Sequence, residues 1–417
     1  MSAPWRMKAL CLAGRIILEN GGETYRAEDT VIHMAQSLGL CEVDVFGVPS
    51  GLFISFTDEE GERITSVTRI FPRSIHLSRV DAVNQLSRQL SAKVLDPQAL
   101  LPALKEAETL DGALRAGYGP GAAAVAALGF AVMFGGGWVD MLVGAACAAL
   151  TQMVPYWLRH KNAGAMSCAL LGSLFCTLIP QLFHALTGLG VTEAMVASAI
   201  MPLLPGLSMT NAVQDILRGD MLSGVAHGAR AVMLAALVAG GALIGTHLYG
   251  MLEVWLSLPI QSTMPAQGAT TALWLRAGVI AVSSFVAGVG LGALFYAPRK
   301  AMLWGAALGA VGYLCYWLAL EWGASEAVAM FMSAFLAAMG AQCAAKRLHM
   351  IATIFVTIAI LPLVPGLGLY RAMSAIAMGQ MGTGLATAAQ TMALILMIAL
   401  GVGLGSALLG AGKRLER

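Results

Sequence analysis

Charged residues are scarce in this chain of 417 residues, because Asp, Glu, Lys and Arg together make up only 12% of it. Hydrophobic residues account for 58% and glycine for 48 positions, a composition too apolar for a soluble multidomain protein. The formal net charge is only +2, so the chain lacks the strongly basic surface of a nucleic-acid-binding protein. The composition therefore predicts a membrane protein whose partner is the lipid bilayer, with no nucleic acid as a partner.

Sequence motifs for cofactors, metals and hydrolysis are also missing. The seven cysteines form no CxxC pair, and five of them lie in apolar runs, where a thiol behaves as a small hydrophobic side chain. No GxSxG, Walker loop or HExxH motif occurs, so neither a metal nor a cofactor is expected. The apolar stretch at residues 9–13 is interrupted by Arg15 and followed by no cleavage site, which argues against a secretory signal.

The charges that are present divide the chain into unequal parts. Residues 1–116 hold 12 Lys/Arg and 15 Asp/Glu, a net charge of −3, whereas the other 301 positions hold 13 and 8, a net charge of +5. We expect a cytoplasmic α+β domain at 1–116, a five-helix membrane repeat at 117–250, an extracytoplasmic linker at 251–271, and a second five-helix repeat with a cytoplasmic tail at 272–417. The predicted fold class is an α-helical membrane protein with about ten transmembrane helices, preceded by this small domain.

The first 116 residues change their hydrophobic period several times. A period near 3.6 predicts helices at 7–18, 23–38, 78–90 and 97–110, and alternation predicts strands at 41–48, 52–57 and 63–71. The turns at 49–51 and 58–61 make these strands a β-meander packed on helices. Gly and Pro at 117–121 are typical of a hinge into the membrane.

One polar cluster in this domain has the spacing of acid/base machinery. Glu23, Arg26, Asp29 and His33 are three or four residues apart, so they share one face of the second helix. The alternative is a solvated helix face with weak ion pairs, and it is favoured because no nucleophile motif accompanies the cluster.

The remaining sequence contains ten segments near the ~20 apolar residues that span a bilayer. These segments are residues 120–135, 138–158, 165–187, 191–217, 221–249, 273–296, 301–320, 325–344, 349–378 and 382–410. Lys and Arg fall at alternate connections, at 159–161, 218, 299–300, 346–347 and 413–414, and none occurs at 250–271. The excess of positive charge predicts that both termini are cytoplasmic, with Arg276 and Arg371 as departures from the rule.

An internal repeat is the most informative feature of the chain. Residues 201–207 (MPLLPGL) recur as residues 361–367 (LPLVPGL), and the same offset of 160 matches Gly219 with Gly379 and Gly224 with Gly384. Two prolines and a glycine in one heptad are difficult to obtain by chance. Each repeat holds five segments, an odd number, so the two halves enter the membrane from opposite sides, as in secondary transporters built from inverted repeats.

The prolines of the repeat predict an interrupted helix in each half. Pro202 with Pro205, and Pro362 with Pro365, lack the backbone N–H and clash with the preceding helical turn, so neither segment runs unbroken. New half-helices beginning at Gly206 and Gly366 would direct unpaired N–H groups and a positive dipole end at a cavity suited to a carboxylate.

Polar residues follow each break and are the candidate ligands. The substrate-binding candidates are Ser208, Thr210, Asn211, Asp215, Tyr370 and Arg371. Asn211 and Arg371 are matched by the repeat and lie about 7.5 Å beyond their glycines, whereas Asp215 lies about 13 Å away toward the cytoplasm. Arg371 is the stronger candidate, with an interfacial, snorkelling arginine as the alternative. For Asp215 the alternative is an exposed cytoplasmic residue.

Protons have four candidate carriers. Asp140 and Asp215 are the candidates for coupling, with a loop-end position as the alternative for Asp140. His184 and His227 are the other candidates because a free imidazole titrates near neutral pH, but a single histidine in a helix is more often simply hydrogen-bonded.

Several of these stretches together resemble the threonine/serine exporter family. They are residues 20–30 (NGGETYRAEDT), the turn 48–51 (VPSG), residues 204–206 (LPG) through Thr210-Asn211-Ala212 to Asp215, Gly219-Asp220, Ser223-Gly224, and 364–366 (VPG) with Arg371. The resemblance covers nearly the whole chain. It implies a cytoplasmic domain joined to ten membrane helices, and efflux of threonine and serine across a bacterial inner membrane, driven by the proton-motive force.

The resemblance fixes the class of protein better than its cargo, because split members of the family are linked to succinate export. It also implies a hydrolase-like N-terminal domain. We therefore expect an inner-membrane antiporter that exports a small carboxylate-bearing substrate against protons, most simply threonine or serine, and a homo-oligomer is compatible with the sequence. The alternatives are a C4-dicarboxylate exporter, a membrane-tethered hydrolase and a channel.

Overall fold

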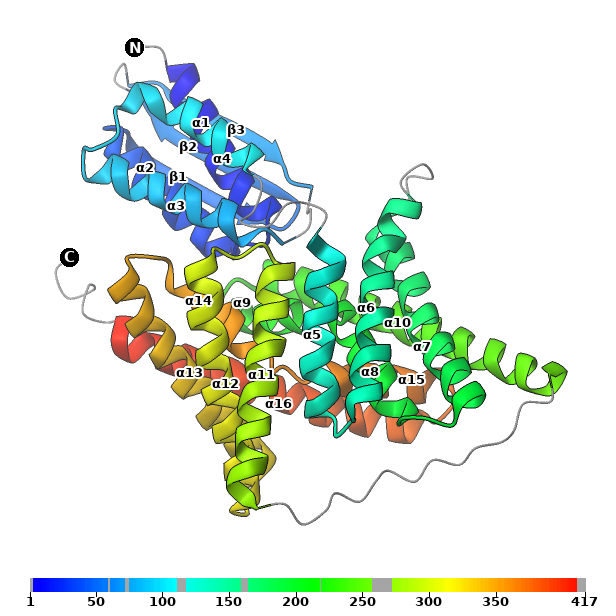
Figure 1. The fold of residues 1–417 in the computed structure, drawn as a ribbon. Coiled ribbons are helices and arrows are strands. Elements are labelled where there is room, and N and C mark those ends of the chain that lie inside the picture. Colours follow the sequence, from blue (N-terminus) through cyan, green and yellow to red (C-terminus); the bar gives the residue numbers. More distant parts are fainter. Residues whose placement is uncertain are drawn as a thin grey trace.

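The computed structural model describes residues 3–58, 61–71, 75–110, 118–158, 164–217, 219–256 and 272–410. An N-terminal α+β unit lies on one side of a larger layer of helices (Figure 1). The charged loops expected at 159–161 and 218, the linker at 251–271 (apart from the end of α10, to residue 256) and the C-terminal tail at 411–417 lie outside the described residues.

The N-terminal unit confirms the predicted order of helices and strands. It consists of α1 (Ala3–Glu19), α2 (Thr24–Ser37), β1 (Cys41–Val48), β2 (Gly51–Thr57), β3 (Arg63–Arg69), α3 (Leu77–Ser91), η1 (Pro97–Ala99) and α4 (Leu100–Thr109). The three antiparallel strands pair in the order β1-β2-β3. Leu52, Ile54 and Phe56 of β2 are buried beneath the helices, whereas Phe53, between Leu52 and Ile54, is 41% exposed, so one face of the sheet makes the core.

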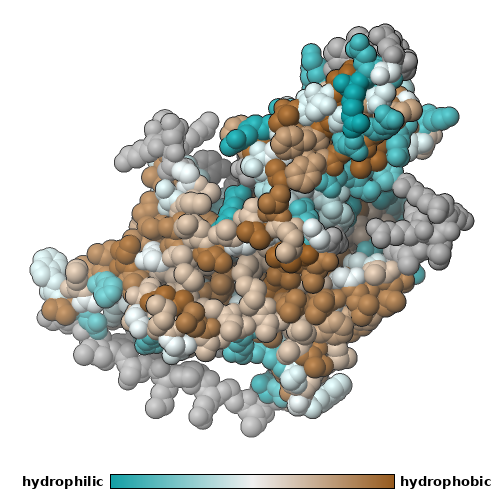
Figure 2. Space-filling view, turned by 180° about the vertical axis from the view of Figure 1, so that it is seen from behind, coloured by the Kyte–Doolittle hydropathy of each residue, from teal (hydrophilic) through white to brown (hydrophobic). Residues whose placement is uncertain are grey.

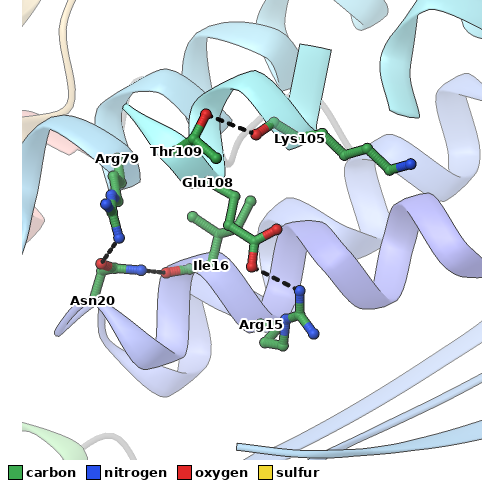
Figure 3. A network of polar contacts seen from close by, with 7 residues as sticks. All are labelled: Arg15, Ile16, Asn20, Arg79, Lys105, Glu108 and Thr109. Atoms are coloured by element: carbon green, nitrogen blue, oxygen red, sulfur yellow. Dashed lines mark hydrogen bonds and ion pairs between the residues drawn. The ribbon is translucent and has the colours of Figure 1, made fainter. Parts of the chain in front are cut away.

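Polar contacts tie the helices of this unit together (Figure 3). Arg15 of α1 forms an ion pair with Glu108 of α4 at 2.8 Å. Asn20 donates to the Ile16 carbonyl at 2.7 Å and accepts from Arg79 of α3 at 3.4 Å. The two hydrogen bonds of Asn20 fix the end of α1, where Gly21 adopts the left-handed conformation that ends the helix.

All ten predicted apolar segments form helices, two of them as broken pairs. The elements are α5 (Gly119–Met133), α6 (Trp138–Trp157), α7 (Ala165–Thr187), α8 (Thr192–Ile200), η4 (Met201–Leu203), α9 (Gly206–Leu217), α10 (Met221–Leu256), α11 (Leu273–Leu294), α12 (Arg299–Glu321), α13 (Glu326–Leu348), α14 (Ala352–Ile360), α15 (Gly366–Ala377) and α16 (Met381–Gly410). Of the described helices, seven are long and apolar enough to cross a membrane, or eight if the bent α8–α9 pair is one span. The chain is therefore an α-helical, multi-pass membrane protein, and the count of ten spans stays a prediction.

The surface agrees with a membrane location for the helical layer. Figure 2 shows hydrophobic side chains over the helices, whereas hydrophilic side chains gather on the N-terminal unit. Exposed apolar side chains such as Val254, Trp255 and Trp274 are more than 70% accessible. Lipid is the medium that removes the cost of exposing such side chains.

One local prediction needs correction. Gly119, Pro120 and Gly121 belong to the first turn of α5 and do not form a hinge. Proline is well tolerated there because the first turn needs no N–H donors. The preceding Gly117 lies outside the described residues.

Both predicted helix breaks are present. α8 and η4 end at the PLLPG motif, and the chain bends by 53° before it continues as α9. α14 ends at the matching PLVPG motif and α15 follows it. The new half-helices begin at Gly206 and Gly366, as the prolines predict.

Candidate functional site

The two breaks pack against each other at the centre of the helical layer. A Cβ atom placed on Gly206 would lie 2.5 Å from Cγ1 of Val364, and one placed on Gly366 would lie 3.2 Å from Cβ of Leu204. Both contacts are closer than an ordinary van der Waals contact, so glycine is what lets the two backbones approach. Only about 30 Å³ of space remains among the apolar side chains around this crossing. We call it the central constriction.

A cavity of about 420 Å³ lies between the constriction and the N-terminal unit, and we call it the proximal cavity. The first broken helix supplies Pro202, Pro205, Ser208 and Asn211, and the N-terminal unit covers the cavity with residues that include 18–19 and 21–23. The volume falls in the range of about 300–1,000 Å³ usual for small-molecule sites. The cavity is therefore large enough for a small metabolite.

A carboxylate and an imidazole are hydrogen-bonded at the side of the proximal cavity. Asp215 of α9 is only 2% exposed, and its carboxylate lies 3.0 Å from Nδ1 of His227 on α10. The guanidinium-bearing Arg230 lies one turn further along α10 and lines the same cavity. Asp215 is thus buried next to a titratable partner and does not occupy the exposed position that was its alternative.

A second cavity of about 380 Å³ lies on the other side of the constriction, and we call it the distal cavity. The second broken helix lines it with Pro362, Pro365, Gly368 and Arg371. Helices α5, α12, α13 and α16 supply the other walls. The two cavities are similar in volume; the first break lines the proximal cavity, and the second break, with Met201 from the first, lines the distal cavity.

Two charged residues, Arg371 and Glu326, line the distal cavity. Arg371 donates to Glu193 at the start of α8, at 2.7 Å, and both side chains are more than half exposed. Glu326, the first residue of α13, accepts from the Tyr316 hydroxyl at 3.3 Å and from Gln390 at 3.1 Å. Arg371 and Glu326 therefore place opposite charges on different walls of one cavity.

The remaining predicted ligands line neither cavity. Thr210 is fully buried and donates to the Gly206 carbonyl at 3.2 Å, within its own helix. Tyr370 packs against a buried apolar cluster that includes Val238. Sequence reasoning placed the candidates from both breaks around one ligand, with Asp215 further toward the cytoplasm, whereas Ser208, Asn211 and Asp215 line the proximal cavity and Arg371 lines the distal one.

Asp140 and His184 have structural partners. The two carboxylate oxygens of Asp140 accept backbone N–H groups from Gly137 and Val191, each at 2.7 Å, and the residue is 2% exposed. Nδ1 of His184 contacts the Leu189 carbonyl at 3.1 Å. These bonds hold the loop that leads into α8.

The structure separates the polar cluster of the N-terminal unit into two pairs. Arg26 contacts both Glu23 and the Thr353 hydroxyl, and the same hydroxyl lies 3.3 Å from Glu23. Thr353 belongs to the first turn of α14, so this half of the cluster joins the unit to the second broken helix. Asp29 and His33 form a separate exposed pair at 3.5 Å. No single acid/base site results.

Further contacts hold the N-terminal unit on the helical layer. The backbone N–H groups of Leu77 and Ser78 donate to the carbonyls of Phe295 and Tyr296, both at 3.0 Å. The rings of His76 and Tyr296 stack at 4.7 Å, and Arg88 donates to the His349 carbonyl at 3.2 Å. The unit therefore binds the ends of helices α11 and α13.

Sequence reasoning missed two charged residues that line the cavities, Arg230 and Glu326, and the partner of Arg371, Glu193. A signal for two of them was available, because the offset of 160 places Arg230 opposite Gln390 and an offset of 161 places Ala165 opposite Glu326. All four residues line a cavity. Comparing the repeats at every position, and not only at identical residues, would have identified these positions as equivalent.

Comparison with protein families and curated proteins identifies relatives of the chain. Residues 8–249 match the family described as "Putative threonine/serine exporter", and residues 280–408 match the one described as "Threonine/Serine exporter". A Mycobacterium tuberculosis protein named "Probable threonine/serine exporter" is 25% identical over 409 residues, 95% of this chain and 76% of the relative. The "Threonine/serine exporter" of Corynebacterium glutamicum is 26% identical over 79% of this chain and 67% of its own length.

A more distant relative is named for a different cargo. The "Probable succinate transporter subunit YjjP" of Klebsiella aerogenes is 22% identical over 56% of this chain and 90% of the relative. No solved structure matches the chain significantly. The two family matches together cover both halves of the sequence. This multi-pass bacterial membrane protein therefore belongs to the threonine/serine exporter family.

Proposed function

We propose that this membrane exporter is a proton-driven carrier for threonine and serine that works by alternating access. One observation carries the proposal, namely two cavities of similar volume on opposite sides of a single apolar constriction. A substrate bound at the crossing of the broken helices would reach one cavity or the other as the two halves tilt. A channel would instead need one continuous path through the constriction.

The repeat supports a two-fold relation between the cavities, which we propose are built by inverted five-helix repeats. An offset of 160 carries many lining residues of the proximal cavity onto lining residues of the distal one. The pairs include Pro202 with Pro362, Pro205 with Pro365, Ser208 with Gly368, Asn211 with Arg371, His227 with Thr387, Arg230 with Gln390, and Leu234 with Leu394. The contact of Gly206 with Val364 likewise has its counterpart in that of Gly366 with Leu204.

The directions of the helices agree with inversion. α5 begins beside the N-terminal unit and runs away from it, whereas its counterpart α11 ends beside that unit (Figure 1). We therefore propose the boundaries 1–116 for the N-terminal domain, 117–250 and 272–417 for the repeats and tail, and 251–271 for the linker.

The charges near the N-terminal domain indicate the orientation. The domain binds next to Arg299 and Lys300 at the start of α12, and next to Lys346 and Arg347 at the end of α13. Positive residues accumulate on the cytoplasmic side of membrane proteins. We propose that the N-terminal domain, both termini and the proximal cavity face the bacterial cytoplasm, and that the distal cavity faces outward.

Proton coupling is assigned to Asp215 and His227. A buried carboxylate beside an imidazole can exchange a proton with the cavity when a substrate changes its surroundings. Asp140, the other candidate, has both oxygens bonded to backbone N–H groups, which suits an anchor better than a carrier of protons. Arg230 on the same wall supplies a positive charge for the carboxylate of an incoming substrate.

A dicarboxylate is the second candidate cargo, because of the similarity to a protein named for succinate transport. The deciding experiment is counterflow of labelled threonine, serine and succinate in proteoliposomes containing the full chain, with and without an imposed pH gradient. Saturable exchange of threonine and serine that the gradient accelerates is the expected result. Flux without counterflow would indicate a channel, and exchange of succinate alone would replace the proposed cargo.

A further inference from the structure

We infer that the distal cavity is a zwitterion site, in which Arg371 binds the substrate carboxylate and Glu326 binds its ammonium group. The inference rests on the proposed function and names the residue that would choose between its two candidate cargoes. Both side chains line the same cavity of about 380 Å³, Arg371 from the second broken helix and Glu326 from the start of α13. An α-amino acid carries its two charges on adjacent carbons, so a site with both counter-charges recognises this class of compound.

Arg371 is available to a ligand. Its partner Glu193 is 76% exposed and Arg371 itself is 56% exposed, so their bond competes with water and contributes little stability. Guanidinium groups bind carboxylates through two parallel hydrogen bonds, the geometry that an incoming substrate can offer. A substrate carboxylate would therefore replace Glu193 without loss of hydrogen bonds.

Glu326 is held in place and retains capacity to accept. The Tyr316 hydroxyl contacts one carboxylate oxygen, and the Gln390 amide donates to the other. A carboxylate has about four acceptor positions on its two oxygens, so two positions remain for the three donors of an ammonium group. The neighbours on α12 and α16 fix the direction of these positions.

The two charges are not a by-product of the duplication. The repeat places Asn211 opposite Arg371 and Ala165 opposite Glu326. Neither Asn211 nor Ala165 carries a charge. The lining of the proximal cavity contains one arginine, Arg230, and three carboxylates, Glu19, Glu23 and Asp215, at positions that differ from those of Arg371 and Glu326 in the repeat. Each cavity thus contains an arginine and at least one carboxylate at positions that the repeat does not match, which favours a substrate with charges of both signs.

The arrangement predicts selectivity against dicarboxylates. Succinate bound through one carboxylate to Arg371 would bring its second carboxylate toward Glu326, where like charges repel. Glycerate is a sharper probe, since it is serine with a hydroxyl group in place of the ammonium. When glycerate occupies the site, the Glu326 carboxylate has no positively charged partner on the ligand.

The test measures how well unlabelled serine, glycerate and succinate each inhibit counterflow of labelled serine by the full-length protein in proteoliposomes. For the wild type we expect serine to inhibit at least ~10-fold more strongly than either competitor. In Glu326→Gln this preference should fall close to one, while Glu326→Asp should keep most of it. Glu321→Gln is the matched control, because Glu321 pairs with Arg276 and lies outside the lining of the cavity.

Two results would overturn the inference in different ways. If Glu326→Gln keeps the wild-type preference for serine over glycerate, Glu326 does not bind the ammonium group and the inference fails while the exporter stands. If the wild type exchanges none of the three compounds, the proposed function itself fails. Thermal unfolding of each variant in detergent shows whether it is folded, and Glu326→Ala, which also removes the carboxylate, repeats the comparison if the glutamine variant is not folded.

Discussion

The closest approach of the two broken helices is at Gly206, and adding one methyl group there should impair both folding and transport. In Gly206→Ala the new Cβ would lie 2.5 Å from Cγ1 and 3.3 Å from Cβ of Val364. Ordinary carbon contacts are about 3.5–4.0 Å, so one backbone must move by about 1 Å. Gly206 does not have a positive φ, so the conformation itself accepts alanine and the contact alone causes the effect.

The size of the effect follows from the stiffness of the neighbour. Valine branches at Cβ and has few alternative rotamers, so Val364 cannot turn its methyl group away. Overpacking of this kind costs about 1–3 kcal/mol, or roughly 5–150-fold if it acts on the equilibrium between the inward-facing and outward-facing states. Gly366→Ala should be milder, because its Cβ would meet Leu204 only at 3.2 Å.

Thermal unfolding and serine counterflow of the same purified variants provide the assay. Gly206→Ala should lower both, and the double variant Gly206→Ala/Val364→Ala should recover part of the loss because it removes the clashing Cγ1. The coupling energy between the two positions should be at least about 1 kcal/mol. Wild-type stability and flux in Gly206→Ala, or strictly additive effects in the double variant, would refute the packing of the constriction described above.

Four further predictions concern the cavities and the N-terminal domain. Arg371→Ala should abolish substrate flux and leave a folded, inserted protein; wild-type flux would remove Arg371 from the site. Asp215→Asn should retain serine counterflow but lose its acceleration by a pH gradient, and unchanged acceleration would exclude Asp215 as the coupling residue. Arg26→Ala should increase hydrogen exchange in the first turn of α14, because its bonds to Glu23 and Thr353 are lost; unaltered exchange there would show that these bonds do not hold the domain. Burial raises the pKa of Asp81, although the Gln85 hydrogen bond and Arg88 act in the opposite direction. The native state therefore favours the protonated acid, and the stability that this protonated acid contributes is lost as the pH rises through the raised pKa. Asp81→Asn should therefore raise the melting temperature at neutral pH but not below about pH 4, and an equal change at both would contradict the burial effect.

Much of the fold could be predicted because local chemistry and tertiary structure agree. The alternation at 41–48 and the turn at 49–51 gave the β1–β2 hairpin within a residue, and the apolar runs gave every helix of the membrane layer. Pro205 and Pro365 fixed the starts of α9 and α15 at the next residue, because proline cannot supply the N–H that a continuing helix needs.

The site was harder to predict, because it depends on which helices meet. Distance along α9 placed Asp215 beyond the ligand, but α10 folds back and brings His227 against it. Helix periodicity grouped Glu23 and Arg26 with Asp29 and His33, whereas docking of the domain on Thr353 separates them. Nothing in the local sequence around Glu193 or Glu326 shows that one meets Arg371 and the other shares its cavity.

Alternating access is the central claim, and thiol labelling from defined sides of the membrane tests it most directly. Ser208 lines the proximal cavity and Thr387 the distal one, so each is replaced by Cys, singly, in a variant whose seven native cysteines are substituted. A membrane-impermeant maleimide is added from the cytoplasmic side for Ser208→Cys and from the outer side for Thr387→Cys, with and without saturating serine under an imposed pH gradient. The account predicts opposite changes in the two labelling rates, since opening one cavity closes the other. Rates that rise or fall together, or that do not respond to serine, would contradict it.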